Sequence, residues 1–479
     1  MKKKIVLYNP RAVFYTMPLA LLALGSRFDP AQYDVRIVDA RVERDAHARL
    51  LEEIEGALCL GVTVLTGAPI RDALAASRAA KTKRPDLPIV WGGWHPSLFA
   101  EQCLQESSVD VAVIGQGEET FAEIVARLGS GDSLNGVQGI VHRNSRAPNS
   151  NRQSPDDLRA EAPRPLLDLN HLPASNYDLI DVEKFFAVKK TRQFDYISSQ
   201  GCRFRCTFCA DPYVYKRGWY GLEPARMGQE LERWWKKFHF ADVGFQDETF
   251  FTNPQRVAAI ANEFLKRDLH FTWMATMRAD QGFRLDEALL NLCKRAGLRR
   301  VMIGVESGSQ QMLDWMKKDI KLEQVFDSAE KCKRAGVGII FNVIVGFPHE
   351  PPESITESLR VAKELRAMSP DFEVAFFYYK PYPGNEIADM LVRDGYQFPK
   401  TLDAWADFDY VGSSGPWVTR EKFTLVERFK FYQRLAWNRA SPLRVPLQQL
   451  ARWRCANDVY AFPFEKKLVE LLRQPIQLS

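Results

Sequence analysis

Three cysteines lie close together in the middle of the chain. Cys202, Cys206 and Cys209 form a Cys-x3-Cys-x2-Cys motif directly after a predicted strand. A short loop of this kind can wrap three thiolates around one face of a cubane cluster, in which each iron normally takes one thiolate. Three local ligands leave one iron open to a substrate or a cofactor. The motif therefore predicts a [4Fe–4S] cluster with one exchangeable iron.

Other chemistries remain open for these thiols. A structural zinc site takes four ligands, usually as two separated pairs, and no second Cys-x2-Cys or His-x3-His occurs. A redox pair needs only Cys206 and Cys209 and leaves Cys202 without a role. Three buried structural thiols are the last alternative. The other cysteines among the eight are scattered, which is typical of small buried side chains and not of a disulfide framework.

Composition narrows the class of protein. The chain has 479 residues, of which 46% are hydrophobic and 26% charged, as in ordinary globular proteins. A net charge of +5 is nearly balanced over this length and does not indicate a nucleic-acid partner. The apolar start is too short for a signal peptide, and no run of about 18 apolar residues predicts a membrane span. We expect a cytoplasmic protein of several domains.

The first part of the chain alternates strand-like and helix-like stretches, which predicts an α/β fold with a doubly wound parallel sheet. The expected strands are residues 4–8, 35–39, 57–64, 89–92 and 109–114. Such a sheet binds ligands at the carboxyl ends of its strands. Those ends carry the candidate binding residues Thr63, Leu65, Gly92, Gly93, Gly115, Gly117 and Glu118. No Gly-x-Gly-x-x-Gly follows the first strand, which argues against a dinucleotide site.

A second strand–helix series follows a linker rich in Asn, Ser, Arg and Pro. Its expected strands are residues 194–198, 242–245, 271–275, 300–305, 338–345 and 373–379. The segment Cys293–Gly297 recurs as Cys332–Gly336, each copy ending a helix before an apolar strand. Repeated units of this kind predict a whole or partial α/β barrel. We expect the domains 1–140, 141–189 (linker), 190–385 (partial barrel) and 386–479 (helical C-terminal region).

The cysteine motif, with Phe208 at its aromatic position, resembles that of the radical S-adenosylmethionine superfamily over roughly residues 190–385. The resemblance implies a [4Fe–4S] cluster held by Cys202, Cys206 and Cys209, whose open iron binds S-adenosylmethionine and whose reduction yields a 5′-deoxyadenosyl radical. It also implies a low-potential electron donor of flavodoxin or ferredoxin type. The residues that it assigns to S-adenosylmethionine are Phe208, Asp247, Glu248, Glu306, Ser307 and Gly346. The sequence departs from the family at Gln246-Asp247-Glu248, where Gly-Gly-Glu is usual.

Thr63-x-Leu65 followed by Gly92-Gly93 resembles the spacing of cobalamin-binding domains, with Thr in place of the usual Ser. Small residues at strand ends let a flat corrin approach the backbone closely. The Asp-x-His-x-x-Gly motif is absent, so the resemblance implies cobalamin bound without a histidine ligand to cobalt. His95 lies on a candidate binding loop and is expected to be a core residue, or a residue that supports the binding residues, and not a ligand to cobalt.

Together the two parts resemble radical S-adenosylmethionine enzymes with an N-terminal cobalamin-binding domain. The resemblance implies a methyltransferase acting on an unactivated carbon of a small-molecule or lipid-like substrate. Two alternatives stay open, a cyclase or ring-rearrangement enzyme without methyl transfer, and a cobalamin or redox sensor.

The aromatic and basic tail, residues 417–475, has two interpretations. It is either a helical cap on the barrel or a surface that contacts the inner face of a membrane. Acidic residues dilute its positive charge, which favours the cap.

Overall fold

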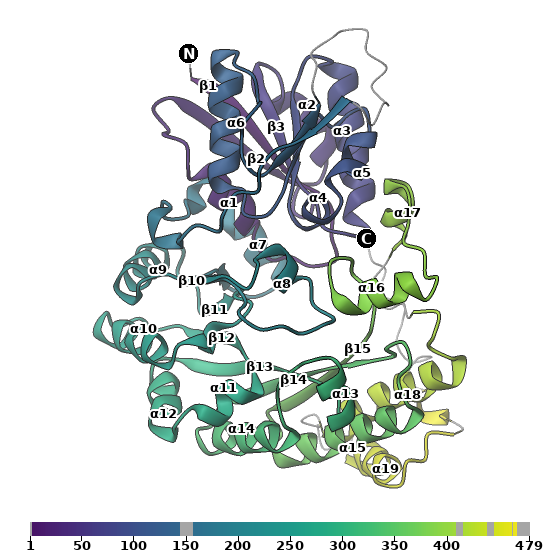
Figure 1. Cartoon of the computed structure of the whole chain (residues 1–479). Coiled ribbons are helices and arrows are strands. Elements are labelled where there is room, and N and C mark those ends of the chain that lie inside the picture. The colour runs from purple at the N-terminus through teal and green to yellow at the C-terminus, as the bar shows by residue number, and fades with distance from the viewer. Residues whose placement is uncertain (1, 144–156, 409–414, 438–444, 462, 467–479) are drawn as a thin grey trace. The chain divides into compact units, whose positions relative to one another are not determined.

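The computed structural model describes residues 2–143, 157–408, 415–437, 445–461 and 463–466. The chain forms two compact units. The first comprises Met1–Glu248, Asn262–Thr272 and Tyr382–Asp409, and the second comprises Thr249–Ala261, Trp273–Pro381 and Tyr410–Ser479. Figure 1 labels the elements of both. Within the described ranges, no helix is long and apolar enough to span a membrane.

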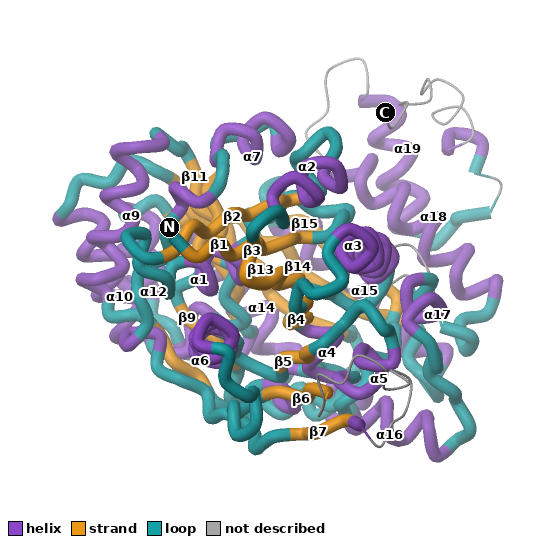
Figure 2. Tube along the Cα trace, turned by 90° about the horizontal axis from the view of Figure 1, so that it is seen from above, coloured by secondary structure: helices purple, strands orange, loops and turns teal. Residues whose placement is uncertain are grey.

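A seven-stranded sheet forms the centre of the first unit, in the order β2-β1-β3-β4-β5-β6-β7, which Figure 2 shows from above. Its strands are β1 (Lys3–Asn9), β2 (Tyr33–Asp39), β3 (Ala57–Thr63), β4 (Ile89–Gly92), β5 (Val111–Val113), β6 (Ile140–Arg143) and β7 (Leu158–Ala160). The strands from β2 to β5 run parallel, as expected. Two antiparallel edge strands, β6 and β7, extend the sheet beyond the expected five.

Both faces of this sheet are covered, because successive side chains of a strand point to opposite faces. Ile5 and Leu7 of β1 belong to one buried cluster, and Val6 and Tyr8 belong to the other. Helices α1 and α6 lie on one side, and α2, α3 and α5 lie on the other (Figure 2). The helices are α1 (Leu19–Gly25), α2 (Ala46–Glu53), α3 (Pro69–Lys83), α4 (Trp94–Leu98), α5 (Ala100–Gln105) and α6 (Glu118–Ser130). The doubly wound fold is confirmed.

The first unit also contains the cysteine motif. Its further elements are α7 (Val182–Lys189), β8 (Gln193–Tyr196), β9 (Ser199–Gly201), α8 (Asp211–Val214), β10 (Trp219–Gly221), α9 (Pro224–Phe238), β11 (Asp242–Phe245), α16 (Glu386–Arg393) and α17 (Leu402–Ala406). β8 pairs with β11 in parallel. The short strands β9 and β10 form an antiparallel pair on either side of the cysteine loop. Residues 144–156, the central part of the predicted linker, lie outside the described residues.

The second unit continues the strand–helix alternation after α10 (Pro254–Lys266). Its strands, paired in parallel in chain order, are β12 (Thr272–Met277), β13 (Leu298–Glu306), β14 (Gly338–Val345) and β15 (Phe372–Tyr378). Its helices are α11 (Ala279–Arg284), α12 (Glu287–Arg295), α13 (Gln310–Trp315), α14 (Leu322–Arg334), α15 (Pro352–Met368), α18 (Arg420–Trp437) and α19 (Val445–Ala456). Open parallel strands alternating with helices are the architecture of a partial barrel.

Candidate cofactor-binding site

A cavity of about 450 Å³ lies in the first unit, at the carboxyl ends of the parallel strands. This volume falls within the usual range of small-molecule sites, about 300–1,000 Å³. All seven binding residues expected in this domain line the cavity. The seven are Thr63, Leu65, Gly92, Gly93, Gly115, Gly117 and Glu118.

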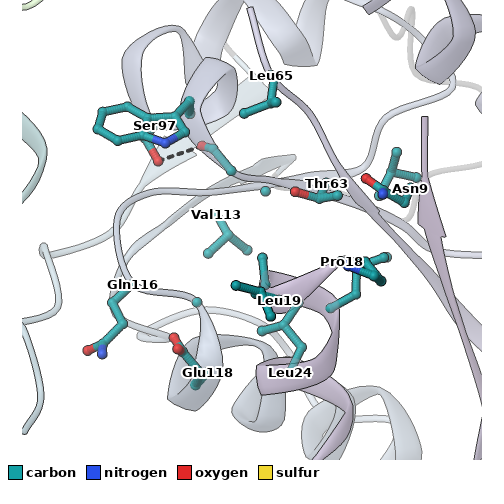
Figure 3. Close-up of a pocket in the computed structure, with 18 of the residues that line it drawn as sticks. Asn9, Pro18, Leu19, Leu24, Thr63, Leu65, Ser97, Val113, Gln116 and Glu118 are labelled. Atoms are coloured by element: carbon teal, nitrogen blue, oxygen red, sulfur yellow. Dashed lines mark hydrogen bonds between the residues drawn. The ribbon is translucent and has the colours of Figure 1, made fainter. Parts of the chain in front are cut away.

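Thr63, Leu65 and Glu118 are labelled in Figure 3, where they surround the same space as Gln116 and Val113.

Gly93 lets the backbone after β4 approach the backbone after β3 closely at this edge of the sheet. Gly93 has a φ of 99°, and a Cβ there would lie 3.1 Å from both Thr63 Oγ1 and the Val64 nitrogen. The Ser97 hydroxyl donates to the Gly93 carbonyl at 2.7 Å and accepts from the Gly115 N–H at 3.0 Å. The loops after β3, β4 and β5 are therefore fixed against one another before any ligand binds.

Two charged side chains, Glu118 and Arg41, are among the residues that line the cavity. Glu118 is buried at the start of α6, and burial raises the pKa of its carboxyl group. Arg41, which the sequence analysis missed, also lines the cavity. Asp39 holds the Arg41 guanidinium through two contacts, at 2.9 Å and 2.6 Å. The site can therefore offer a carboxyl group and a fixed cation to a ligand, beside apolar and uncharged polar side chains.

His95 is not among the residues that line the cavity. Its side chain is fully buried, with Nδ1 3.3 Å from Thr66 Oγ1 and the ring packed against Phe99 and Trp405. Burial lowers its pKa to about 3. This is a core position, and the absence of a histidine ligand to cobalt stays a prediction.

Three polar residues from the cysteine-motif segment help to form the wall of the cavity. They are Gln200 in β9, Tyr215 after α8 and Gln246 after β11. Asp195 in β8 accepts hydrogen bonds from the Met17 N–H at 2.8 Å and from Gln246 Nε2 at 3.2 Å. The same cavity is thus bounded by the doubly wound sheet and by the segment that carries the cysteines.

The cysteine loop is compact. Cys202 and Cys206 are each 9% exposed, and Cys209 is half-buried. Burial raises the pKa of Cys209, and the negative charges of Asp211, Cys206 and Cys202 raise it further, so the three thiols lie near one another. No three His, Cys, Asp or Glu side chains of the described residues surround a single metal-ion position. A cubane requires no such arrangement, because each iron takes its own thiolate. The loop therefore fits the predicted cluster.

Two hydrogen bonds from the start of α16 and the residue before it support this loop. The Asn385 side-chain amide donates to the Phe208 carbonyl at 3.3 Å, and the Ile387 N–H donates to the Thr207 carbonyl at 3.1 Å. The sequence gives no local signal for these contacts, because 177 residues separate Asn385 from Phe208. They fix the backbone at Phe208, which the resemblance assigns to S-adenosylmethionine.

Asp247 and Glu248 lie beside the cysteine loop but have different roles. Asp247 is buried and accepts hydrogen bonds from the Ser198 N–H at 2.8 Å and from the hydroxyls of Ser198 and Ser199 at 2.6 and 2.5 Å. It thereby holds the connection between β8 and β9. Glu248 accepts from the Gly201 N–H and from the Tyr215 hydroxyl, both at 3.1 Å. Burial, with the charge of Asp211, raises its pKa to about 7.

The remaining three expected residues, Glu306, Ser307 and Gly346, belong to the second unit. Glu306 ends β13 with a φ of 65° and forms a buried ion pair with Lys318 at 2.6 Å. A Cβ at Gly304 would overlap Glu306 Oε1, at 2.1 Å, so the glycine makes room for this carboxylate. Gly346 follows β14 with a φ of 77° and donates its N–H to Glu350 at 2.5 Å. Their contacts to S-adenosylmethionine stay predictions.

Comparisons with known proteins find two family models that match different parts of the chain. The family model of the B12 binding domain matches residues 6–125, and that of the radical SAM superfamily matches residues 196–362. An uncharacterized methyltransferase of Pyrococcus horikoshii is 28% identical over 388 residues, which are 79% of each chain. An anaerobic magnesium-protoporphyrin IX monomethyl ester cyclase of Rubrivivax gelatinosus is 27% identical over 370 residues, covering 75% of this chain and 63% of the relative.

A solved structure shares the fold. The radical S-adenosylmethionine methyltransferase TsrM from Kitasatospora setae superposes with a TM-score of 0.73 at 15% identity, covering 98% of this chain and 100% of that chain. The chain thus carries an N-terminal region similar to the B12 binding domain and a following region similar to the radical SAM superfamily. These domains imply a [4Fe–4S] cluster, S-adenosylmethionine and cobalamin as cofactors.

Proposed function

We propose that this protein is a cobalamin-dependent radical S-adenosylmethionine methyltransferase acting on an unactivated carbon of a small-molecule or lipid-like substrate. One observation carries the proposal. A single cavity is lined both by the glycine-rich strand ends of the B12 binding domain and by Gln200, Tyr215 and Gln246 beside the cysteine loop. A site that joins these two parts suits a reaction that needs a radical and a methyl donor close to one substrate.

When bound, the cluster with S-adenosylmethionine supplies radical chemistry, and cobalamin supplies a methyl group. The chain's own residues bind and orient these groups. Cys202, Cys206 and Cys209 would hold the cluster, while Thr63 and Gly93 would hold the corrinoid. Fixed loops cost less ordering free energy when they bind than flexible ones.

The test is anaerobic reconstitution with iron, sulfide and hydroxocobalamin, followed by S-adenosylmethionine and a reductant. We expect both 5′-deoxyadenosine and S-adenosylhomocysteine, together with a methylated product. Replacing Cys202, Cys206 or Cys209 by Ala removes a thiolate ligand and should abolish cluster absorbance and 5′-deoxyadenosine formation. Cys293→Ala is the control, because Cys293 is buried in α12.

A cyclase without methyl transfer is the second candidate, and the relative in Rubrivivax gelatinosus favours it. It predicts 5′-deoxyadenosine without S-adenosylhomocysteine or a methylated product. A cobalamin or redox sensor predicts neither compound. The same assay therefore separates the three functions.

We further propose that an acidic electron carrier of flavodoxin or ferredoxin type reduces the cluster. Exposed cations lie within and just after the cysteine loop, namely Arg203, Arg205, Lys216 and Arg217. Opposite charges accelerate encounter, and salt weakens this effect. Replacing Lys216 and Arg217 by Glu should slow reduction by the carrier several-fold at low salt and leave reduction by dithionite unchanged. Equal rates with the carrier would contradict the proposal.

Aromatic side chains at the ends of β14 and β15 support a substrate with apolar surface. Phe347 lies 4.5 Å from Tyr379 and 6.0 Å from Trp315, measured between ring centroids. Trp315 is 37% exposed and can be truncated without opening the core. Trp315→Ala should raise KM for the substrate and leave the cluster intact. An unchanged KM would place the substrate elsewhere.

A further inference from the structure

A hydrogen-bonded chain runs from the cavity to the backbone of the cysteine loop. Gln116, after β5, donates its amide to Gln200 Oε1 at 2.8 Å. Gln200 and Tyr215 both line the cavity. Tyr215 donates to Glu248, whose other carboxylate oxygen accepts from the Gly201 N–H. Gly201 directly precedes Cys202.

Tyr215 is the member of this chain that joins the two sites. It lines the cavity, where its ring packs edge-on against Trp94 at 6.0 Å and an interplanar angle of 89°. Burial keeps its pKa well above the ordinary value, so the hydroxyl remains a donor. A ligand that displaces the ring also displaces the hydroxyl from Glu248 and the loop.

We propose that Tyr215 is a positioning residue that couples occupancy of the corrinoid cavity to the conformation of the cluster loop through Glu248 and Gly201. This inference rests on the proposed function, because it needs both cofactors to bind. Coupling between two sites is reciprocal, so cluster assembly must change corrinoid affinity by the factor by which corrinoid changes the cluster site.

The experiment measures the dissociation constant of hydroxocobalamin by absorbance titration, with the full chain either carrying its reconstituted cluster or free of it. In the wild type we expect the two constants to differ at least about five-fold, the lower end of usual coupling. In Tyr215→Phe, which keeps the ring, the difference should vanish. Tyr220→Phe removes an exposed hydroxyl from β10 and is the matched control, with the wild-type difference retained.

Glu248→Gln keeps the size of the side chain but leaves one carbonyl oxygen to accept from both the Tyr215 hydroxyl and the Gly201 N–H, so it should also remove the difference, which guards against a folding defect of one variant. Equal dissociation constants with and without the cluster in the wild type would overturn the inference. A difference in Tyr215→Phe as large as that of the wild type would also overturn it. Both results would leave the proposed function intact. Failure of the wild type to bind corrinoid at all would overturn both, and so the two failures are distinguishable.

Discussion

At the scale of single residues, alanine substitutions at Gly92 and Gly93 should have different effects, the first on ligand binding and the second on the stability of the fold. A Cβ at Gly92 meets only Val113, at an ordinary 3.7 Å, and both residues line the cavity. Gly92→Ala should therefore keep its thermal midpoint and bind hydroxocobalamin about tenfold more weakly, since overpacking costs about 1–3 kcal/mol. Gly93→Ala should instead lose about 1–3 kcal/mol of stability, because its backbone conformation is reserved for glycine. Titration and thermal unfolding measure the two effects, and unchanged affinity in Gly92→Ala would contradict the assignment of the cavity.

Glu118 makes stability depend on pH. Burial raises its pKa in the folded chain, so the folded state binds this proton more tightly than the unfolded state. The free energy of unfolding must then fall as pH rises from the ordinary pKa of glutamate through the raised pKa of Glu118 in the folded chain. In corrinoid-free protein, Glu118→Gln should match the wild type near pH 4 and be more stable at pH 8. Urea midpoints across this range measure the difference, with exposed Glu52→Gln as the control. Parallel profiles for Glu118→Gln and the wild type would rule out this role.

At the scale of elements, the β9–β10 pair fixes the start of the cysteine loop. Gly201 has a φ of 92°, and a Cβ there would lie 2.2 Å from the Gly218 carbonyl oxygen. Gly395 has the same φ but no neighbour within 4 Å of its Cβ position. Gly395→Ala should cost only backbone strain, about 1–2 kcal/mol, whereas Gly201→Ala should also separate the strands. Iron and sulfide content after reconstitution should fall in Gly201→Ala alone, and full iron content there would show that the loop does not need this pair.

The sequence predicts the elements that have a strong pattern. Buried parallel strands are near-continuous apolar runs, so β1, β3 and β14 are recognisable, and strand ends at one edge of a sheet must meet. This explains why all seven expected residues line one cavity. The strands β9 and β10 have three residues each, too few to show a period. The roles of Tyr215 and Asn385 depend on contacts with distant segments, which no local pattern records.

At the scale of the whole molecule, the tail has two interpretations that solution experiments can separate. In α18, Phe429 and Tyr432 are fully buried, and Phe423 stacks on Tyr378 at 5.0 Å. Trp453 of α19 is 54% exposed. Residues 438–444, 462 and 467–475 of the tail lie outside the described residues. These contacts support the helical cap, and membrane contact stays a prediction of the alternative.

For the cap we expect no flotation of purified protein with anionic liposomes at low or high salt. Electrostatic attraction to such a surface would be worth about 1 kcal/mol per nearby cation and would weaken with salt. Salt-sensitive flotation that is lost in Trp453→Ala would contradict the cap and support membrane contact.

The two compact units should respond differently to corrinoid. Every residue that lines the cavity belongs to the first unit. A ligand bound there therefore stabilises the folded form of that unit by mass action. The stabilisation is about 2.7 kcal/mol when the free ligand concentration is one hundred times the Kd. Hydrogen exchange reports such local stabilisation segment by segment. With hydroxocobalamin we expect slower exchange in residues 9–21, 61–65 and 113–118, and unchanged exchange in residues 273–381. The Gly92→Ala chain at the same corrinoid concentration should show a smaller effect in the same segments. Equal protection of both units would mean that corrinoid contacts the second unit as well, and absence of protection in the first would remove the cavity as its binding site.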